Sequence, residues 1–396
     1  MLVLLTTLQH SVCTGTRAHR DAIVMMVQNK HSTYDSRHST EAGSVVDNLV
    51  HYYKAAADAD VLLWHDDNFT LASDSQTVNT RLCNLLESGG WGPPEGMNVS
   101  SVLRVGPGKN KKNSKSTPFS LGYRNMIRFY SVTIWPTLYG LGYRFVMRID
   151  DDSLFLSPVP YNLFDRMREK GAIYAHRQTS TECGSSEFRP FVTKALNLSR
   201  RYCGFSKSDQ KSRLAAEEEI QGFYNNFFVS DISWWLSPTV QRLVLAFDKS
   251  GLIYTRRDND LVFQSAAVKL LSPRTAIYKY VDWAYAHITV NDGKWCHGGA
   301  STGTLKLSDV DAIERRFVRW AHERYNVSVI PHRFHCAPEV LLTRSRTKFF
   351  MHYSPTCPTY DRHLYGSTRN PKASCIGNLA PRVGKSLARK SCPPEF

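Results

Sequence analysis

The feature that most constrains the fold is an apolar run, YRFVMRI at residues 143–149, which ends directly in three aspartates. A short run of this kind, rich in Val, Ile and aromatic residues, is typical of a central strand buried in a sheet. Its acidic end, Asp150-Asp151-Asp152, stands at the carboxyl end of the strand. Open α/β sheets bind their ligands at that edge, so the triplet marks a candidate site.

Strands and helices alternate along the first part of the chain. Residues 22–28 and 61–64 are short apolar runs typical of strands, and residues 45–53 have helical spacing between them. We expect a second helix over residues 77–86, then a long surface loop over residues 87–118, which is rich in Gly, Pro, Asn, Lys and Ser. This order predicts an α/β fold, a single Rossmann-like domain with a mixed, mostly parallel sheet flanked by helices.

Three regions follow from this pattern. Residues 1–20 form an N-terminal segment whose apolar stretch is too short to span a bilayer and lacks a basic flank, so we expect a remnant signal or anchor, or disorder. Residues 21–300 form the main domain. Residues 301–396 form an extension with helical spacing near 309–325, followed by an irregular, cysteine-containing tail.

The formal net charge of +15 suits an anionic ligand, which includes nucleic acid, a membrane surface and the phosphates of a nucleotide sugar. No zinc-finger spacing or aromatic RNA-binding signature is present, so we expect no nucleic-acid partner. Nine cysteines without a CxxC pair indicate neither a structural zinc site nor a thioredoxin-like motif. Four glycosylation sequons favour the secretory pathway, where disulfides form; they begin at Asn68, Asn98, Asn197 and Asn326.

Adjacent carboxylates repel one another unless a cation compensates, and hard oxygen ligands suit Mg²⁺ or Mn²⁺. Such an ion can bridge the phosphates of a nucleotide sugar and neutralise the charge that develops on the departing diphosphate. The alternative is a plain Asp-rich turn. Acidic runs do occur as solvated surface, as we expect for Glu217-Glu218-Glu219, so the strand context is what favours a cation site.

Several segments match, in order, the motifs of one known family. They are GYRNMIRFYS at 122–131, YRFVMRIDDDSLF at 143–155, FYNNFFVSDISWW at 223–235, SGLIYTRRDNDLVFQSAA at 250–267 and YVDWAYAH at 280–287. The pattern resembles the fungal α-1,2-mannosyltransferases of glycosyltransferase family 15. This resemblance implies an A-type nucleotide-sugar glycosyltransferase fold, GDP-mannose as donor, a mannose-containing glycan or glycoprotein as acceptor, and retention of anomeric configuration. It also implies Mn²⁺, the Golgi lumen and membrane association, although no segment reaches transmembrane length without charges.

The resemblance assigns roles on the donor side of the site. Asp150 and Asp152 fall on the acidic positions of the family's E-P-D motif, and His287 falls on the histidine that completes the metal site. Tyr123 and Arg148 are implied to contact the donor, and Arg148 can also offset the carboxylates. Ordinary packing on a helix and a strand is the alternative for these two.

On the sugar side, the resemblance implies catalytic roles for Asp260 and Asp231 and an acceptor contact for Tyr224, which can stack on a sugar face. The family's glutamate near the reactive carbon is replaced by Phe228, which cannot act as a nucleophile or stabilise positive charge. Three alternatives follow: front-face attack with the departing phosphate as base, a substitute acid such as Asp231, or an inactive protein. Two other functions compete with this one. The protein could be a metal-dependent transferase that uses another nucleotide sugar, or a non-catalytic protein that binds polyanions.

Overall fold

The computed structural model describes most of the main domain. It covers residues 12–27, 41–66, 69, 78–99, 121–151, 153–180, 222–291 and 294–301, together with short pieces at 183–184, 187–188, 191–192, 194–195, 312, 315–316, 319, 323, 328–330 and 374–375. Asp152, the basic part of the loop after Val99, and most of the extension, including the helix expected near 309–325, lie outside the described residues.

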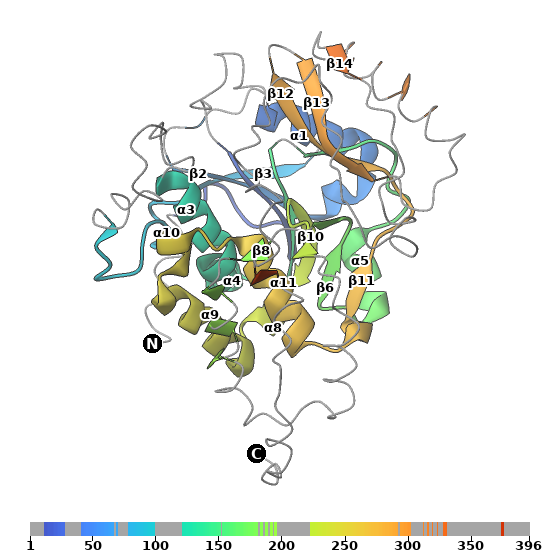
Figure 1. The fold of residues 1–396 in the computed structure, drawn as a ribbon. Coiled ribbons are helices and arrows are strands. Elements are labelled where there is room, and N and C mark those ends of the chain that lie inside the picture. The colour runs from blue at the N-terminus through green and yellow to red at the C-terminus, as the bar shows by residue number, and fades with distance from the viewer. Residues whose placement is uncertain are drawn as a thin grey trace, which may run out of the picture.

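A seven-stranded sheet forms the centre of the molecule (Figure 1). Only one of its strands runs antiparallel to its neighbours, and the other pairs are parallel. This arrangement confirms the predicted mixed, mostly parallel sheet. In spatial order the strands are β11 (Ile277–Lys279), β6 (Tyr174–His176), the antiparallel β10 (Phe227–Asp231), β4 (Phe145–Ile149), β1 (Asp21–Met26), β2 (Asp60–His65) and β3 (Asn79–Asn84).

Helices cover both faces of this sheet. One face packs against α1 (Glu41–Tyr52), the 3₁₀ helix η3 (Lys54–Asp58) and α5 (Leu163–Lys170). Helix α5 begins where the Asn162 side chain accepts hydrogen bonds from two backbone amides, and it ends at Gly171 in the left-handed conformation.

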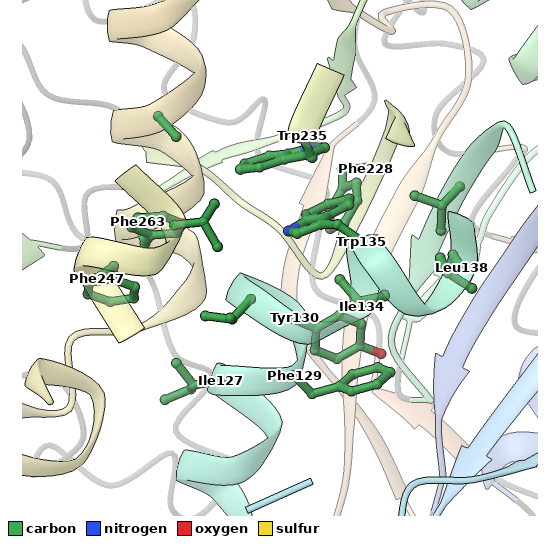
Figure 2. Close-up of a cluster of buried hydrophobic side chains, with 14 of the residues drawn as sticks. Ile127, Phe129, Tyr130, Ile134, Trp135, Leu138, Phe228, Trp235, Phe247 and Phe263 are labelled. Carbon is green, nitrogen blue, oxygen red and sulfur yellow. The ribbon is translucent and has the colours of Figure 1, made fainter. Parts of the chain in front are cut away.

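The opposite face carries a larger, aromatic-rich core (Figure 2). There the stacked rings of Trp135 and Trp235 are 4.2 Å apart, as are those of Phe247 and Phe263. This layer fixes the helices whose ends reach the candidate site. They are α3 (Leu121–Arg128), the π-helical η4 (Phe129–Thr133), α4 (Ile134–Gly140), α8 (Ile232–Trp235), α9 (Pro238–Ser250), α10 (Leu252–Arg256) and α11 (Asp260–Leu271), with η5 (Arg274–Ala276) next to β11.

A second sheet begins directly after the acidic triplet. Strand β5 (Ser153–Phe155) pairs with β12 (Tyr285–Asn291), which continues to β13 (Lys294–Ser301) and β14 (Ser328–Ile330). Two short pairs complete the strands, β7 (Thr179–Ser180) with β9 (Gly222–Phe223), and β8 (Cys183–Gly184) with β15 (Ser374–Cys375).

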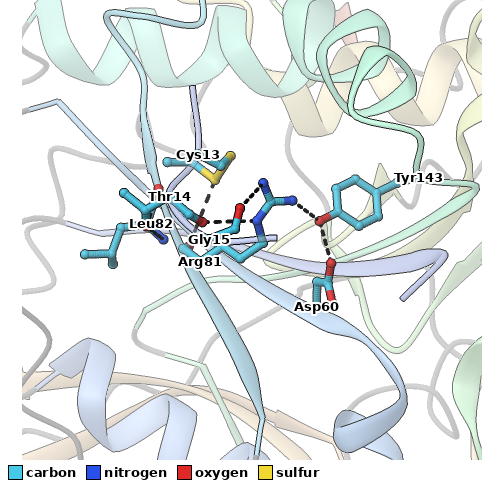
Figure 3. The surroundings of a disulfide bond; sticks show 8 residues. Cys13, Thr14, Gly15, Asp60, Arg81, Leu82 and Tyr143 are labelled. Atoms are coloured by element: carbon cyan, nitrogen blue, oxygen red, sulfur yellow. Dashed lines mark hydrogen bonds between the residues drawn. A yellow bond between two sulfur atoms is a disulfide. The ribbon is translucent and has the colours of Figure 1, made fainter. Parts of the chain in front are cut away.

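The expected helix over residues 77–86 is wrong, because this segment is strand β3 in parallel register with β2. A disulfide joins Cys13 to Cys83, so that the chain at residues 12–14 runs beside β3 (Figure 3). Arg81 donates to the Tyr143 hydroxyl at 2.8 Å, which in turn donates to Asp60 at 2.7 Å. Partners distant in sequence therefore select the extended conformation over the local helical spacing.

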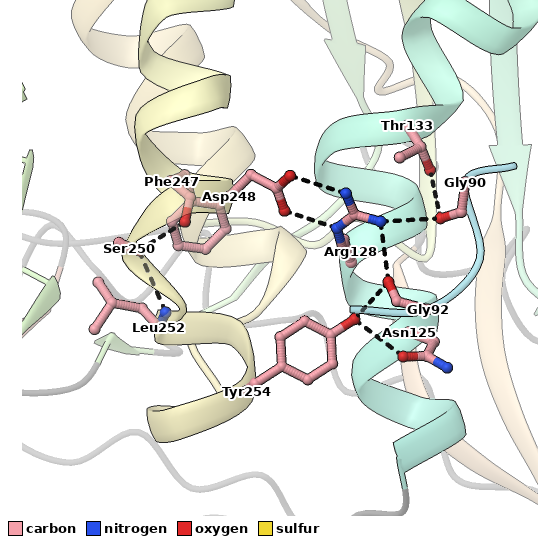
Figure 4. A network of polar contacts seen from close by, with 10 residues as sticks. All are labelled: Gly90, Gly92, Asn125, Arg128, Thr133, Phe247, Asp248, Ser250, Leu252 and Tyr254. Atoms are coloured by element: carbon pink, nitrogen blue, oxygen red, sulfur yellow. Dashed lines mark hydrogen bonds and ion pairs between the residues drawn. The ribbon is translucent and has the colours of Figure 1, made fainter. Parts of the chain in front are cut away.

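The described part of the predicted 87–118 loop is anchored at its start (Figure 4). Arg128 forms a two-pronged ion pair with Asp248, and it also donates to the Gly92 carbonyl at 2.9 Å. The Tyr254 hydroxyl donates to the same carbonyl at 2.9 Å. These bonds hold the segment against α3 and α10. No helix within the described residues has the length and apolar character needed to cross a membrane.

Candidate functional site

The candidate site lies at the edge where the parallel strands have their carboxyl ends. Strand β4 ends there at Ile149, and the backbone amide of the next residue, Asp150, donates to the Asn226 carbonyl at 3.0 Å. Because β10 is antiparallel, it is the beginning of this strand that reaches the same edge. The residues that follow β4 and those that precede β10 therefore meet at the position where α/β folds bind ligands.

Arg148 joins the two carboxylates of the site. Its Nε lies 2.7 Å from Asp150 Oδ1, and its Nη1 forms an ion pair with Asp260 Oδ2. The guanidinium carbon stands 3.6 Å from the centre of the Tyr130 ring, a cation–π contact that covers one face of the group. Burial alone would lower the pKa of Arg148, but the charges of Asp150 and Asp260 raise that pKa well above its usual value.

Only 4% of the Arg148 side chain is exposed, so its polar atoms serve chiefly these carboxylates. The structure places Arg148 in the site, as predicted, and shows it as a bridge between β4 and α11. A direct contact with the donor, which the resemblance implied, remains a prediction.

Asp260 begins α11 and is fixed by two donors. Besides Arg148, Asn225 donates to Asp260 Oδ2 through Nδ2 at 2.8 Å. The preceding residue, Asn259, caps the helix by accepting from the Val262 amide at 2.9 Å. The carboxylate therefore has one defined orientation. Asn225 was not predicted, because nothing in its local sequence indicates a partner 35 residues away.

His287 is brought beside the acidic turn by the second sheet. It pairs with Ser153, whose backbone amide donates to the Asp150 carbonyl at 3.0 Å. Its Nδ1 lies 3.4 Å from the Tyr224 hydroxyl, with the two rings edge to face. The structure thus gathers three of the predicted residues, Asp150, His287 and Tyr224, in one region.

The side chains of the site can be compared with the ligands that a divalent cation prefers. The Asp150 carboxylate and the His287 imidazole are an oxygen and nitrogen set that suits Mn²⁺. Among the described residues, no group of three His, Cys, Asp or Glu side chains is close enough to hold a metal. The third predicted ligand, Asp152, lies outside the described residues. The donors that are described therefore fit the ion, and the full ligand set stays a prediction.

Tyr123 lies on α3 next to a strained arginine. The Arg257 guanidinium is 5.7 Å from the Tyr123 ring centre, and Arg257 has φ of 61° and ψ of 36°. No other non-glycine residue in the described ranges has a positive φ. Such a conformation costs on the order of 1 kcal/mol and is often found at functional sites.

A second arginine, Arg124, lies close to Arg257. Burial, and after it the charge of Arg257, lower the pKa of Arg124, which donates to the carbonyls of Ile253 at 2.9 Å and Tyr254 at 2.7 Å. Two nearby guanidiniums repel unless an anion compensates, so this corner suits phosphate. Neither Arg124 nor Arg257 is indicated by the sequence, since their proximity arises only on folding.

Asp231 is not brought together with the other predicted residues. It ends β10 opposite Phe145, at the start of β4, on the far edge of the sheet. Its carboxylate caps α8 by accepting from the Ser233 amide at 2.8 Å, and it forms an ion pair with Arg144 at 2.9 Å. This placement removes the geometric basis for Asp231 as a substitute catalytic acid.

Phe228 lies directly opposite Arg148 in the β10–β4 pair, so the two side chains share one face of the sheet. It is fully buried, with its ring 5.4 Å from that of Tyr174 and 6.1 Å from that of Trp135. Figure 2 shows Phe228 beside Trp135. The position of the family's glutamate is therefore part of the aromatic core beneath the site.

Known proteins match this chain in sequence and in fold. Residues 87–295 match the sequence model of the family described as glycolipid 2-alpha-mannosyltransferase. Glycolipid 2-alpha-mannosyltransferase 1 of Candida albicans is 24% identical over 178 residues, which cover 43% of this chain and 40% of that protein. The corresponding protein of Saccharomyces cerevisiae is 20% identical over 205 residues, covering 50% and 45%. The chain thus spans less than half the length of the curated relatives it matches.

Among solved structures, core-mannan synthase A of Aspergillus fumigatus, in an Mn/GDP form, superposes with a TM-score of 0.55 at 17% identity. The match covers 68% of this chain and 74% of that one, and it confirms the predicted A-type fold. Since the family model covers just over half of the 396 residues, the chain belongs to the glycolipid 2-alpha-mannosyltransferase family.

Proposed function

We propose that this protein is a metal-dependent glycosyltransferase that moves mannose from GDP-mannose to a mannose-containing glycan or glycoprotein, with retention of configuration and an α-1,2 linkage. The observation that carries the proposal is the link from Asp150 through Arg148 to Asp260, beside His287, at the ligand-binding edge of the sheet. The Mn/GDP form of the relative from Aspergillus fumigatus supports both the nucleotide and the cation.

In this proposal Asp150, Asp152 and His287 hold Mn²⁺, which when bound supplies positive charge to the departing diphosphate. Arg148 orients the Asp150 carboxylate through a charge-assisted hydrogen bond. Tyr123, with the cationic corner next to it, contacts the donor, and Tyr224 contacts the acceptor sugar.

Front-face attack is the chemical route that the described residues favour. Phe228 offers no charge to the reacting carbon, and Asp231 lies at the other edge of the sheet. The departing phosphate is then the base that receives the acceptor's proton, while Asp260 stays held by Arg148 and Asn225 near the reacting sugars.

The test is release of GDP from GDP-mannose with an α-mannoside acceptor, with Mn²⁺ and with a chelator. We expect metal-dependent turnover, and we expect an axial anomeric configuration and a 1,2 linkage in the product by NMR. Asp260→Asn should lower kcat at least about 100-fold, an effect of the size seen when a preorganised charge is removed. A panel of GDP- and UDP-sugars measures donor specificity.

Asp231→Asn is the matched control, because asparagine also caps helices and the residue lies away from the site. It should retain nearly full activity. The proposal would be refuted if the wild-type protein showed no turnover and did not bind GDP. A larger effect of Asp231→Asn than of Asp260→Asn would refute the roles assigned here.

We further propose that the protein works in the lumen of the secretory pathway, at the Golgi. The Cys13–Cys83 disulfide supports this location, since such bonds persist in oxidising compartments. Asn98, which is exposed and begins a sequon, should then carry a glycan. Glycosidase digestion should shift the wild-type protein on a gel, and Asn98→Gln should reduce the shift. An unglycosylated chain whose Cys13 and Cys83 react with thiol reagents in cells would contradict this location.

A further inference from the structure

One amide side chain in the site has no partner among the described residues for either of its polar atoms. Asn226 is 4% exposed, and within the described structure neither its Nδ2 nor its Oδ1 forms a hydrogen bond. Buried polar atoms of folded proteins are paired in the great majority of cases, because an unpaired one loses its hydration without compensation. A doubly unpaired carboxamide therefore indicates a group that is paired when a ligand is bound.

The position of Asn226 connects it to both halves of the site. Its carbonyl accepts from the Asp150 amide at 3.0 Å, which places it next to the proposed metal ligand. The residue before it, Asn225, holds Asp260, and Tyr224 contacts His287. Asn226 thus lies between Asp150, which is proposed to bind the metal, and Asp260, which is proposed to lie near the reacting sugars.

We infer that the Asn226 carboxamide binds the sugar of the donor, with Nδ2 donating to one hydroxyl and Oδ1 accepting from a hydroxyl of the same ring. This inference rests on the proposed function. Phosphate oxygens only accept hydrogen bonds, so a diphosphate can pair with Nδ2 and leaves Oδ1 unpaired. A sugar ring carries adjacent hydroxyls that both donate and accept, and it satisfies the two atoms together.

The inference separates Asn226 from a residue that only stabilises the fold. Replacing a paired structural amide by an apolar side chain lowers stability, whereas removing two unpaired buried polar atoms does not. Asn226→Leu, which keeps a similar size, should therefore melt no lower than the wild-type protein in the absence of ligand.

The experiment measures the affinities of GDP and of GDP-mannose by calorimetry in the presence of Mn²⁺. For Asn226→Leu we expect GDP affinity within about twofold of wild type and GDP-mannose affinity lower by about 10-fold or more, the effect of losing one to two hydrogen bonds. Asn226→Ala, which is smaller, should give the same pattern if leucine does not fit.

Thr80→Val is the matched control. The Thr80 hydroxyl is also buried without a hydrogen-bond partner in the described structure, but it lies on edge strand β3. Its replacement should leave both affinities unchanged.

The outcomes distinguish the inference from the proposed function. Equal weakening of GDP and GDP-mannose by Asn226→Leu would show a contact with the nucleotide, including the guanine base, and would overturn the inference. Unchanged affinity for both ligands would also overturn it, and so would a marked loss of stability without ligand. If the wild-type protein binds neither GDP nor GDP-mannose, the proposed function itself fails.

Discussion

Replacing Arg148 with methionine tests whether this side chain stabilises the site through its ion pairs with the two aspartates. The substitution removes the ion pairs to Asp150 and Asp260. Among the described residues, it leaves Asn225 as the donor to Asp260, whose side chain is 7% exposed. Removing one partner of a buried ion pair costs about 3–5 kcal/mol, because the other charge stays buried without compensation. The Asp150 side chain is 24% exposed, so water replaces part of its lost partner. We therefore expect a loss of about 3 kcal/mol.

Urea unfolding of the wild-type protein, Arg148→Met, Asp260→Asn and the double variant measures this coupling. The double variant should lose at least about 1.5 kcal/mol less than the sum of the single variants, since the two side chains are in direct contact. Arg128→Met is a control, because its ion pair is with Asp248 and its effect should add to that of Asp260→Asn. A loss below about 1 kcal/mol for Arg148→Met, or strict additivity with Asp260→Asn, would refute the reasoning.

Three further predictions concern other parts of the fold. Cys83→Ser should lower the free energy of unfolding by about 2–5 kcal/mol, and reductant should destabilise the wild-type protein but not this variant, which thermal melts will show. Arg257→Gly should relieve the left-handed strain and raise stability by up to about 1 kcal/mol, yet weaken GDP binding; a loss of both would indicate a purely structural role. Burial lowers the pKa of His176 to about 3 from an ordinary 6.5, so protonation favours unfolding and stability falls as the pH drops through this range. His176→Gln should reduce that slope by up to about 1.4 kcal/mol per pH unit, and an unchanged slope in urea titrations would contradict the buried neutral imidazole.

The sequence predicts those elements whose signal is local. Strand β4 combines an apolar run with an abrupt acidic end, and the structure has this strand buried throughout with Asp150 at the predicted edge. Strand β3 was predicted as a helix because its apolar spacing is ambiguous. Its conformation depends on pairing with β2 and on the bond from Cys83 to Cys13, and neither partner is indicated by the segment itself.

The same limit explains the fate of the two predicted catalytic aspartates. Both lie in segments that match the family's motifs, but the match carries no strand direction. Strand β10 is antiparallel, so its five residues lead away from the site, and at roughly 3.4 Å per residue Asp231 is about 14 Å along the strand from Phe227. Asp260 reaches the site because α11 begins there and because Arg148 and Asn225 converge on it. The amino-acid sequence indicates neither the direction of β10 nor the contacts of Arg148 and Asn225 with Asp260.

The effect of Phe228 depends on the ion pairs that Arg148 forms on the same face of the sheet. A glutamate at this position would add a third carboxylate around Arg148, which already serves Asp150 and Asp260. In this chain the aromatic side chain instead packs on Tyr174, directly opposite Arg148 in the strand pair, and it is fully buried. Lower local polarity strengthens the remaining ion pairs, because charge interactions grow as the effective dielectric constant falls. Phe228 therefore leaves Asp150 and Asp260 as the two carboxylates that Arg148 serves, and a charged side chain at this position would compete with them for the guanidinium.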